Sequence, residues 1–124
     1  MALLGIDLGG TKLAFAVFSE TGKILHKETI SLENRKGVEV GNLITTDIIG
    51  LINSGEHPVE SIGISVPGIY YIKTGKVWAP NIPGWDDYPL LQEVKKVSGE
   101  IPVNIDSDRA CYLLGESWQG TARG

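Results

Sequence analysis

The sequence has few of the features that mark disulfide-rich, membrane or nucleic-acid-binding proteins. Cys111 is its single cysteine, so the chain holds no internal disulfide and no cysteine-based zinc site. No apolar run reaches the roughly 18 residues of a membrane helix. The net charge of −4 excludes the basic footprint of a nucleic-acid-binding protein. Met1 leads into an apolar segment without the basic stretch of a signal peptide, so we expect a cytoplasmic protein.

Two well-known phosphate-binding patterns, G-x-x-x-x-G-K-[ST] and G-x-G-x-x-G, are also absent. The sequence instead places Gly9–Lys12, which contains two adjacent glycines, between two apolar segments, residues 2–8 and 13–18. Asp7 lies near the end of the first segment. Both segments have the composition of β-strands. A strand–turn–strand arrangement differs from the strand–turn–helix of those patterns and points to an actin/hexokinase-like nucleotide fold.

The residue types in this turn suit a phosphate ligand. Gly9 and Gly10 allow close approach, and successive backbone N–H groups in a turn bind anions. Thr11 adds a hydroxyl, Lys12 adds a positive charge, and Asp7 is suited to hold Mg²⁺ beside the phosphate. The alternative is an ordinary Gly-Gly hairpin turn. An acid within an apolar strand favours the phosphate-binding interpretation, because burying a charge needs a reason.

The rest of the chain alternates strands and helices within one domain over residues 1–124. We predict further strands over residues 23–31, 61–66 and 101–105, helices over 38–53, 89–98 and 110–118, and a small hairpin over 69–78. Short turns between the first three strands predict an antiparallel meander. A helix between later strands predicts parallel pairing, so the sheet is mixed.

The loop over residues 79–85 contains two prolines and presents Asn81 from a rigid backbone. An amide side chain both donates and accepts hydrogen bonds, which suits a sugar hydroxyl. The alternative is a stabilised surface loop with Trp78 and Trp85 packed into the domain.

Acidic residues follow the last predicted strand, in the run Asp106-Ser107-Asp108. Asp106 or Ser107 is suited to cap the helix that follows. The ordinary interpretation of Asp108 is a first-turn acid that favours the helix dipole.

Taken together, these stretches resemble the ROK family of sugar kinases and repressors, within the actin/hexokinase-like superfamily. The resemblance covers nearly the whole chain. The matching stretches are Gly5-Ile6-Asp7-Leu8-Gly9-Gly10-Thr11-Lys12, Ser65-Val66-Pro67-Gly68, Thr74-Gly75-Lys76-Val77, Ala79-Pro80-Asn81-Ile82-Pro83-Gly84-Trp85 and Asp108 to Gly124 with Gly115-Glu116. The resemblance implies an α/β fold of ribonuclease H-like type, with a mixed five-stranded sheet flanked by helices.

The resemblance also implies an ATP-dependent, glucokinase-like activity on a hexose or amino-hexose. The residues it assigns to the ATP phosphates are Asp7, Gly9, Gly10, Thr11 and Lys12, with Asp7 also serving the Mg²⁺ ion. The residues it assigns to the sugar are Gly68, Asn81, Ser107 and Asp108. Asp108 resembles the general base that accepts the proton of the attacking sugar hydroxyl, a role consistent with phosphoryl transfer chemistry.

The sequence departs from the family pattern on both sides of the predicted base. Family members usually carry Asn immediately before the base and two residues after it, where this chain has Ser107 and Ala110. Ser107 offers the sugar one shorter hydroxyl, so we expect sugar specificity to differ from the usual glucose type.

Family members also have a second domain, with another phosphate loop and the adenine pocket. We therefore expect this chain to be the N-terminal domain of a kinase, with that C-terminal domain as its partner and with little catalysis alone. Exposed apolar surface would favour a homodimer. The alternatives are a sugar-responsive repressor domain and a non-catalytic sugar-binding fragment. The intact Asp7–Lys12 turn and the lack of a basic DNA-reading helix favour the kinase.

Overall fold

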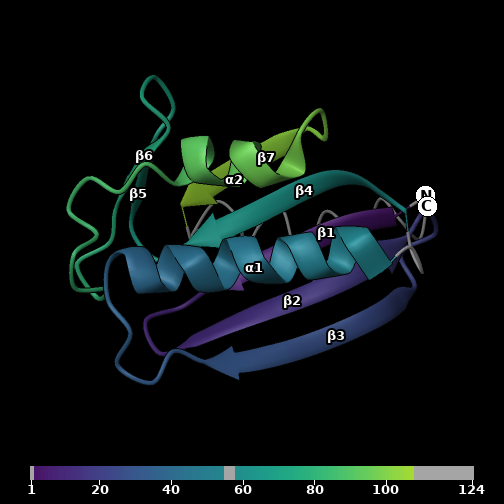
Figure 1. Cartoon of the computed structure of the whole chain (residues 1–124), viewed down its shortest axis with the longest axis horizontal. Coiled ribbons are helices and arrows are strands. Elements are labelled where there is room, and N and C mark those ends of the chain that lie inside the picture. Colours follow the sequence, from purple (N-terminus) through teal and green to yellow (C-terminus); the bar gives the residue numbers. More distant parts are fainter. Residues whose placement is uncertain (1, 55–57, 108–124) are drawn as a thin grey trace.

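A five-stranded mixed sheet forms the centre of the computed structural model, which describes residues 2–54 and 58–107 (Figure 1). The strand order across the sheet is β3-β2-β1-β4-β7. Along the chain the elements are β1 (Ala2–Leu8), β2 (Lys12–Ser19), β3 (Ile24–Ser31), α1 (Val38–Ser54), β4 (Val59–Val66), β5 (Ile69–Tyr71), β6 (Lys76–Trp78), α2 (Leu90–Ser98) and β7 (Val103–Ser107). β1, β2 and β3 pair antiparallel, whereas β1, β4 and β7 pair parallel. The predicted mixed five-stranded sheet is confirmed.

The main core lies between one face of this sheet and the two helices, which lie on the same side of it in Figure 1. Because side chains alternate along a strand, every second residue points toward the helices. On β1 and β4 these are Leu4, Ile6, Leu8, Ile62, Ile64 and Val66, all at most 3% exposed. The apolar stripe of α1 supplies the fully buried Val40, Ile44 and Ile48. Neither α1 nor α2, the helices of the described ranges, has the length and apolar character needed to cross a bilayer.

The last strand lies two residues later in the chain than predicted. It spans Val103–Ser107 rather than 101–105, so the prediction that Asp106 lies beyond the strand is wrong. The reason is the pairing register: Ser65 pairs with Asp106 and Val66 with Ser107. Pro102 precedes the strand, and its carbonyl accepts a hydrogen bond from the Ile62 N–H (2.9 Å). The predicted helix over 110–118 lies outside the described residues.

The small hairpin forms where it was predicted, with β5 and β6 joined by a turn that ends at Gly75. Gly75 has a φ of 73°, a left-handed conformation that glycine adopts without strain. The N–H of Gly75 donates to the carbonyl of Tyr71 (2.8 Å) and closes the turn.

Six residues, Leu32–Gly37, connect β3 to α1. Leu32 is buried, and its N–H donates to the carbonyl of Thr11 (2.9 Å). Arg35 Nη1 donates to the carbonyls of Ser31 (3.1 Å) and Leu32 (3.2 Å). This connecting segment is therefore fastened both to the end of β3 and to the turn between β1 and β2.

Candidate active site at the carboxyl edge of the sheet

The turn between β1 and β2, which we call the phosphate turn, comprises Gly9–Lys12. The N–H of Gly9 donates to the carbonyl of Lys12 (2.8 Å), so this donor is used within the turn itself. The N–H groups of Gly10 and Thr11 make no hydrogen bond to any described residue. Gly10, Thr11 and Lys12 are all exposed. The turn thus offers an anion two backbone N–H donors, the Thr11 hydroxyl and the Lys12 ammonium group.

Asp7 lies near the carboxyl end of β1, and its side chain is exposed. The sequence argument that a buried charge marks this residue is therefore wrong. Its position is informative for another reason: Asp7 pairs with Ser65 on β4, and Ser65 pairs with Asp106 on β7. Residues paired across parallel strands share one face of a sheet. The register thus aligns two carboxylates on either side of a hydroxyl in one row.

Two members of this region, Ser65 and Tyr70, were not predicted as site residues. The half-buried Ser65 lies at the centre of the row, and each of the row's three residues already has an interaction partner. Burial raises the pKa of the Tyr70 hydroxyl, and the charge of Asp106 raises it further. Tyr70 therefore lies close enough to Asp106 for the carboxylate charge to affect the pKa of its hydroxyl. The sequence signal that could have indicated both residues is their position on either side of Pro67-Gly68.

The loop Ala79–Trp85, which we call the Asn81 loop, lies against the phosphate turn. Asn81 is exposed, and a Cβ placed on Gly10 would lie 3.2 Å from the Cβ of Asn81. The structure thus brings together two features that lie 71 positions apart in the sequence numbering. The alternative, in which both tryptophans pack into the domain, is half right: Trp85 is fully buried, but Trp78 is 40% exposed.

Gly68 follows β4, where a side chain would not fit. A Cβ on Gly68 would overlap the carbonyl oxygen of Trp78 and lie 2.9 Å from the Cα of Ala79. The absence of a side chain therefore lets the end of β4 approach the start of the Asn81 loop. Contact between Gly68 and a sugar stays a prediction.

The remaining predicted site residues lie at or beyond the end of β7. Ser107 is half-buried and is the last residue of that strand. Asp108, the predicted general base, and Ala110 lie outside the described residues.

The chemistry at this edge suits a phosphorylated, metal-bound ligand. Lys12 and the two N–H groups of the phosphate turn that have no partner among the described residues are suited to an anion, and the carboxylates of Asp7 and Asp106 are of the kind that Mg²⁺ prefers. Within residues 2–54 and 58–107, no group of three or more His, Cys, Asp or Glu side chains is arranged to hold a metal ion. With two carboxylates at this edge, the residues fit a magnesium ion whose other ligands are phosphate oxygens and water.

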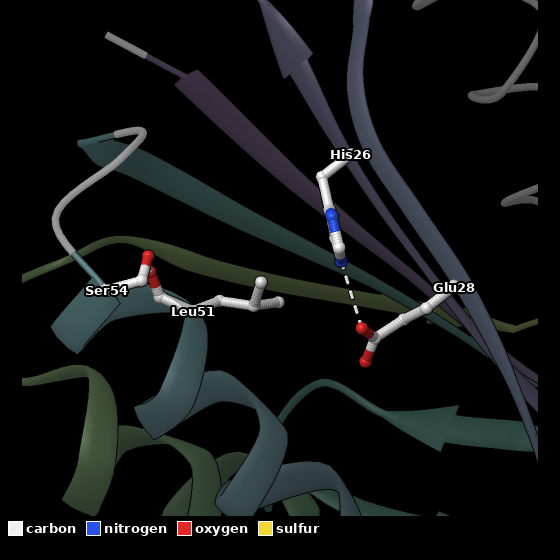
Figure 2. Close-up of polar contacts among 4 residues, drawn as sticks. All are labelled: His26, Glu28, Leu51 and Ser54. Atoms are coloured by element: carbon white, nitrogen blue, oxygen red, sulfur yellow. Dashed lines mark hydrogen bonds and ion pairs between the residues drawn. The ribbon is translucent and has the colours of Figure 1, made fainter.

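A separate cavity of about 260 Å³ lies between α1 and β3. It borders Val59 at the start of β4, whereas Gly68 and the candidate site lie beyond the other end of that strand. Figure 2 shows His26 and Glu28 side by side on β3, with His26 Nε2 2.9 Å from Glu28 Oε2. Across the cavity on α1, Ser54 Oγ donates to the carbonyl of Leu51 (2.9 Å).

Comparison with known proteins identifies the family. The model of the ROK family matches residues 3–124, so the chain belongs to this family. It is 36% identical to a glucokinase from Thermotoga maritima, over 100% of this chain and 39% of that protein. It is 31% identical to an N-acetyl-D-glucosamine kinase from Haemophilus influenzae, over 92% of this chain and 37% of that protein.

Solved structures agree with this assignment and with the actin/hexokinase-like fold. A ROK hexokinase from Thermus thermophilus superposes with a TM-score of 0.83 and 30% identity, covering 100% of this chain and 41% of that one. A ROK family glucokinase from Streptomyces griseus, solved with glucose and AMPPNP, gives a TM-score of 0.75 and 31% identity over 97% of this chain and 37% of that one. The chain thus spans about two fifths of the length of the relatives it matches.

Proposed function

We propose that this chain forms one wall of the active site of an ATP-dependent sugar kinase. The reaction transfers the γ-phosphoryl group of ATP to a hydroxyl of a hexose or amino-hexose. The observation that carries the proposal is the close approach of Asn81 to Gly10 of the phosphate turn, where an added Cβ would lie 3.2 Å from the Cβ of Asn81, at the edge that also holds the row of Asp7 and Asp106. A turn suited to phosphate and a side chain suited to a sugar hydroxyl thereby lie close together at one edge of the sheet.

The phosphate turn is proposed to hold the ATP phosphates. The free N–H groups of Gly10 and Thr11 donate to phosphate oxygens, and Lys12 neutralises part of their charge. Gly9 contributes by shaping the turn, because its own N–H bonds to Lys12 within the turn. Mg²⁺, when bound, neutralises the charge that develops on the transferred group, and Asp7 is the residue proposed to hold it.

The sugar is proposed to lie beside Asn81 and Ser107, with Gly68 leaving space for it. Asn81 donates and accepts hydrogen bonds, and Ser107 adds a hydroxyl. Asp108 is proposed to accept the proton of the sugar hydroxyl that attacks the γ-phosphorus, while the bond to the bridging oxygen of ADP breaks. We also propose a cytoplasmic location, because the reaction uses ATP.

The remaining walls of the site are proposed to come from a second domain. The described site residues Asp7, Lys12 and Asn81 are all exposed, whereas phosphoryl transfer requires that water be kept from the reacting groups. We therefore expect weak ligand binding and little turnover from these 124 residues alone.

The decisive experiment expresses the complete coding sequence that contains this chain and measures ADP release. The panel of acceptors includes glucose, N-acetylglucosamine, N-acetylmannosamine, fructose and allose. We expect one or two of these sugars to drive ADP release, and expect Asp108→Asn to reduce kcat by about 10²-fold or more with an unchanged melting temperature.

Two results would overturn the proposal. ADP release that no acceptor stimulates would remove the kinase assignment, and sugar binding without ADP release would favour the non-catalytic alternative. A near-normal rate in Asp108→Asn would remove the assignment of that residue as the base. Asp86→Asn, on an exposed side chain of the segment before α2, is the matched control for the change of charge.

A further inference from the structure

The Asn81 loop is closed by its own backbone. The N–H of Ala79 donates to the carbonyl of Trp85 (2.8 Å), and the backbone N–H of Trp85 donates to the carbonyl of Ile82 (3.1 Å). Ala79, Ile82 and Trp85 are each at most 2% exposed, whereas Asn81 is exposed between them. The loop is therefore a compact unit that projects Asn81, and its position in the protein depends on how this unit is anchored.

Trp85 anchors the unit to the residue before α1. Its indole Nε1 donates to the carbonyl of Gly37 (2.9 Å), and the N–H of Gly37 donates in return to the carbonyl of Pro83 (2.7 Å). The indole ring also stacks on Tyr88, with ring centroids 4.3 Å apart and planes 6° apart. The two hydrogen bonds run in opposite directions and fix the loop to Gly37.

Close packing at this junction leaves no space for adjustment. A Cβ on Gly84 would lie 2.9 Å from the Cα of Gly37. Both glycines have positive φ, 89° at Gly84 and 49° at Gly37, which other residues adopt only with strain. The approach of the two backbones thus depends on glycine at both positions.

Gly37 is also linked to the phosphate turn. It ends the connecting segment Leu32–Gly37, whose first residue donates its N–H to the carbonyl of Thr11 (2.9 Å). The contacts therefore close a ring that runs from Thr11 to Leu32, along the segment to Gly37, and through Trp85 to Asn81. Asn81 completes the ring by its contact with Gly10.

We propose that Trp85 is a positioning residue, whose indole N–H sets the place of Asn81 relative to the phosphate turn through Gly37. The inference rests on the proposed function, in which these two features hold the sugar and the phosphates. A displacement of about 1 Å between reacting groups costs up to about 10²-fold in rate. Because the indole hydrogen bond acts on the sugar only through the loop, the free energy of one neutral hydrogen bond limits the loss of sugar binding to about tenfold.

The test uses the 124-residue chain and the variant Trp85→Phe, which keeps a buried aromatic ring and removes the N–H donor. Two-dimensional ¹H–¹⁵N NMR spectra report the backbone amide of Gly10 and the side-chain amide of Asn81. We expect both signals to shift in Trp85→Phe, and sugar affinity in the chain, or sugar KM in the complete kinase, to weaken by up to about tenfold.

Two control variants separate positioning from general stability. Trp78→Phe makes the same substitution at an indole that is 40% exposed, and Val94→Ala destabilises the fully buried core of α2. Neither is expected to move the Gly10 and Asn81 signals. If Trp85→Phe fails to fold, Gly84→Ala tests the same junction, because its added methyl group pushes the loop away from Gly37.

The outcomes distinguish this inference from the proposed function. Unmoved Gly10 and Asn81 signals in a folded Trp85→Phe, with unchanged sugar affinity, would overturn the positioning role and leave the kinase proposal intact. Signals that move only in the junction variants, together with a complete protein to which no sugar binds, would support the positioning role and overturn the sugar site. Equal shifts in Val94→Ala would also overturn the inference, because the effect would then be one of stability.

Discussion

The stability of this protein should depend on pH through Asp47, a residue of α1 that faces β3. Burial of the Asp47 carboxyl, its hydrogen bond with Glu28 and the charge of Glu28 together raise its pKa to about 7, whereas the charge of His26 acts in the opposite direction. Oδ2 of Asp47 is buried with no hydrogen-bond partner in the described part of the chain. Glu28 behaves oppositely: its hydrogen bonds with Asp47 and then His26 lower its pKa. Between about pH 4 and 7 the two carboxyls therefore share one proton, which is bound to Asp47.

The direction of the effect follows from proton binding. The folded protein keeps the proton on Asp47 up to about pH 7, whereas the unfolded chain releases it near the ordinary value of 3.8. The unfolded state thus binds fewer protons between these values, so the free energy of unfolding falls as pH rises from about 4 to 7. Above about pH 7 the penalty is constant. Asp47→Asn should remove it, because an amide is neutral and still donates a hydrogen bond to Glu28.

The expected size is smaller than the full shift suggests. One pKa unit corresponds to about 1.4 kcal/mol, so the whole shift would amount to about 4 kcal/mol. Water reaches part of the Asp47 side chain, and the lowered pKa of Glu28 offsets part of the penalty because the two groups titrate as a pair. We expect Asp47→Asn to stabilise the protein by about 1 kcal/mol at pH 8, or about 4 °C in melting temperature.

Urea unfolding at pH 4, 6 and 8 measures the effect. The gain should be absent at pH 4, intermediate at pH 6 and complete at pH 8. Asp86→Asn removes a charge from an exposed side chain and should show no such pH dependence. A gain in Asp47→Asn that is equal at pH 4 and pH 8, or a loss of stability at pH 8, would refute the shared proton.

Three further predictions concern backbone positions, each measured by urea unfolding. Gly41→Ala should cost about 2 kcal/mol, because the new methyl group would overlap Tyr88 Oη, whereas Gly50→Ala on the same helix has open space and should gain about 0.5–1 kcal/mol. Gly68→Ala should cost about 2–3 kcal/mol, because its methyl group meets backbone atoms that cannot rotate away. Asn34→Ala should cost about 1 kcal/mol, since Asn tolerates the left-handed φ of 65° better than Ala, and Asn34→Gly should cost less.

The sheet could be predicted from the sequence because its information is local. Apolar runs indicate β1 and β2, a short turn leads into β3, and a helix with an apolar stripe between strands indicates the parallel crossover to β4. The position of β7 could not be predicted as well, because Asp106 joins the strand only through pairing with Ser65 on β4. The pattern of residues 101–105 contains no information on that register. A polar residue at a strand end therefore needs its partner strand before it can be assigned.

The exposure of Asp7 shows the same limit for the site. An acid among apolar residues suggests a buried charge, but its burial depends on which face its row of the sheet occupies. Its row, with Ser65 and Asp106, is the one that does not point into the main core under α1 and α2. The register, rather than burial, supports the proposal that Asp7 belongs to a site, because Asp7 and Asp106 both lie where the parallel strands end.

The close approach of Asn81 to Gly10 could not be predicted from the sequence, for a different reason. The chemistry of each residue predicts its ligand separately, whereas the two residues are joined by a series of hydrogen bonds through Gly37. That series begins with an indole donor, Trp85, which is 48 residues from the carbonyl it binds. Local patterns identify a tryptophan as a core residue but do not identify its N–H partner. A buried aromatic residue with a polar atom therefore constrains where two halves of a binding site meet, because that atom needs a hydrogen-bond partner.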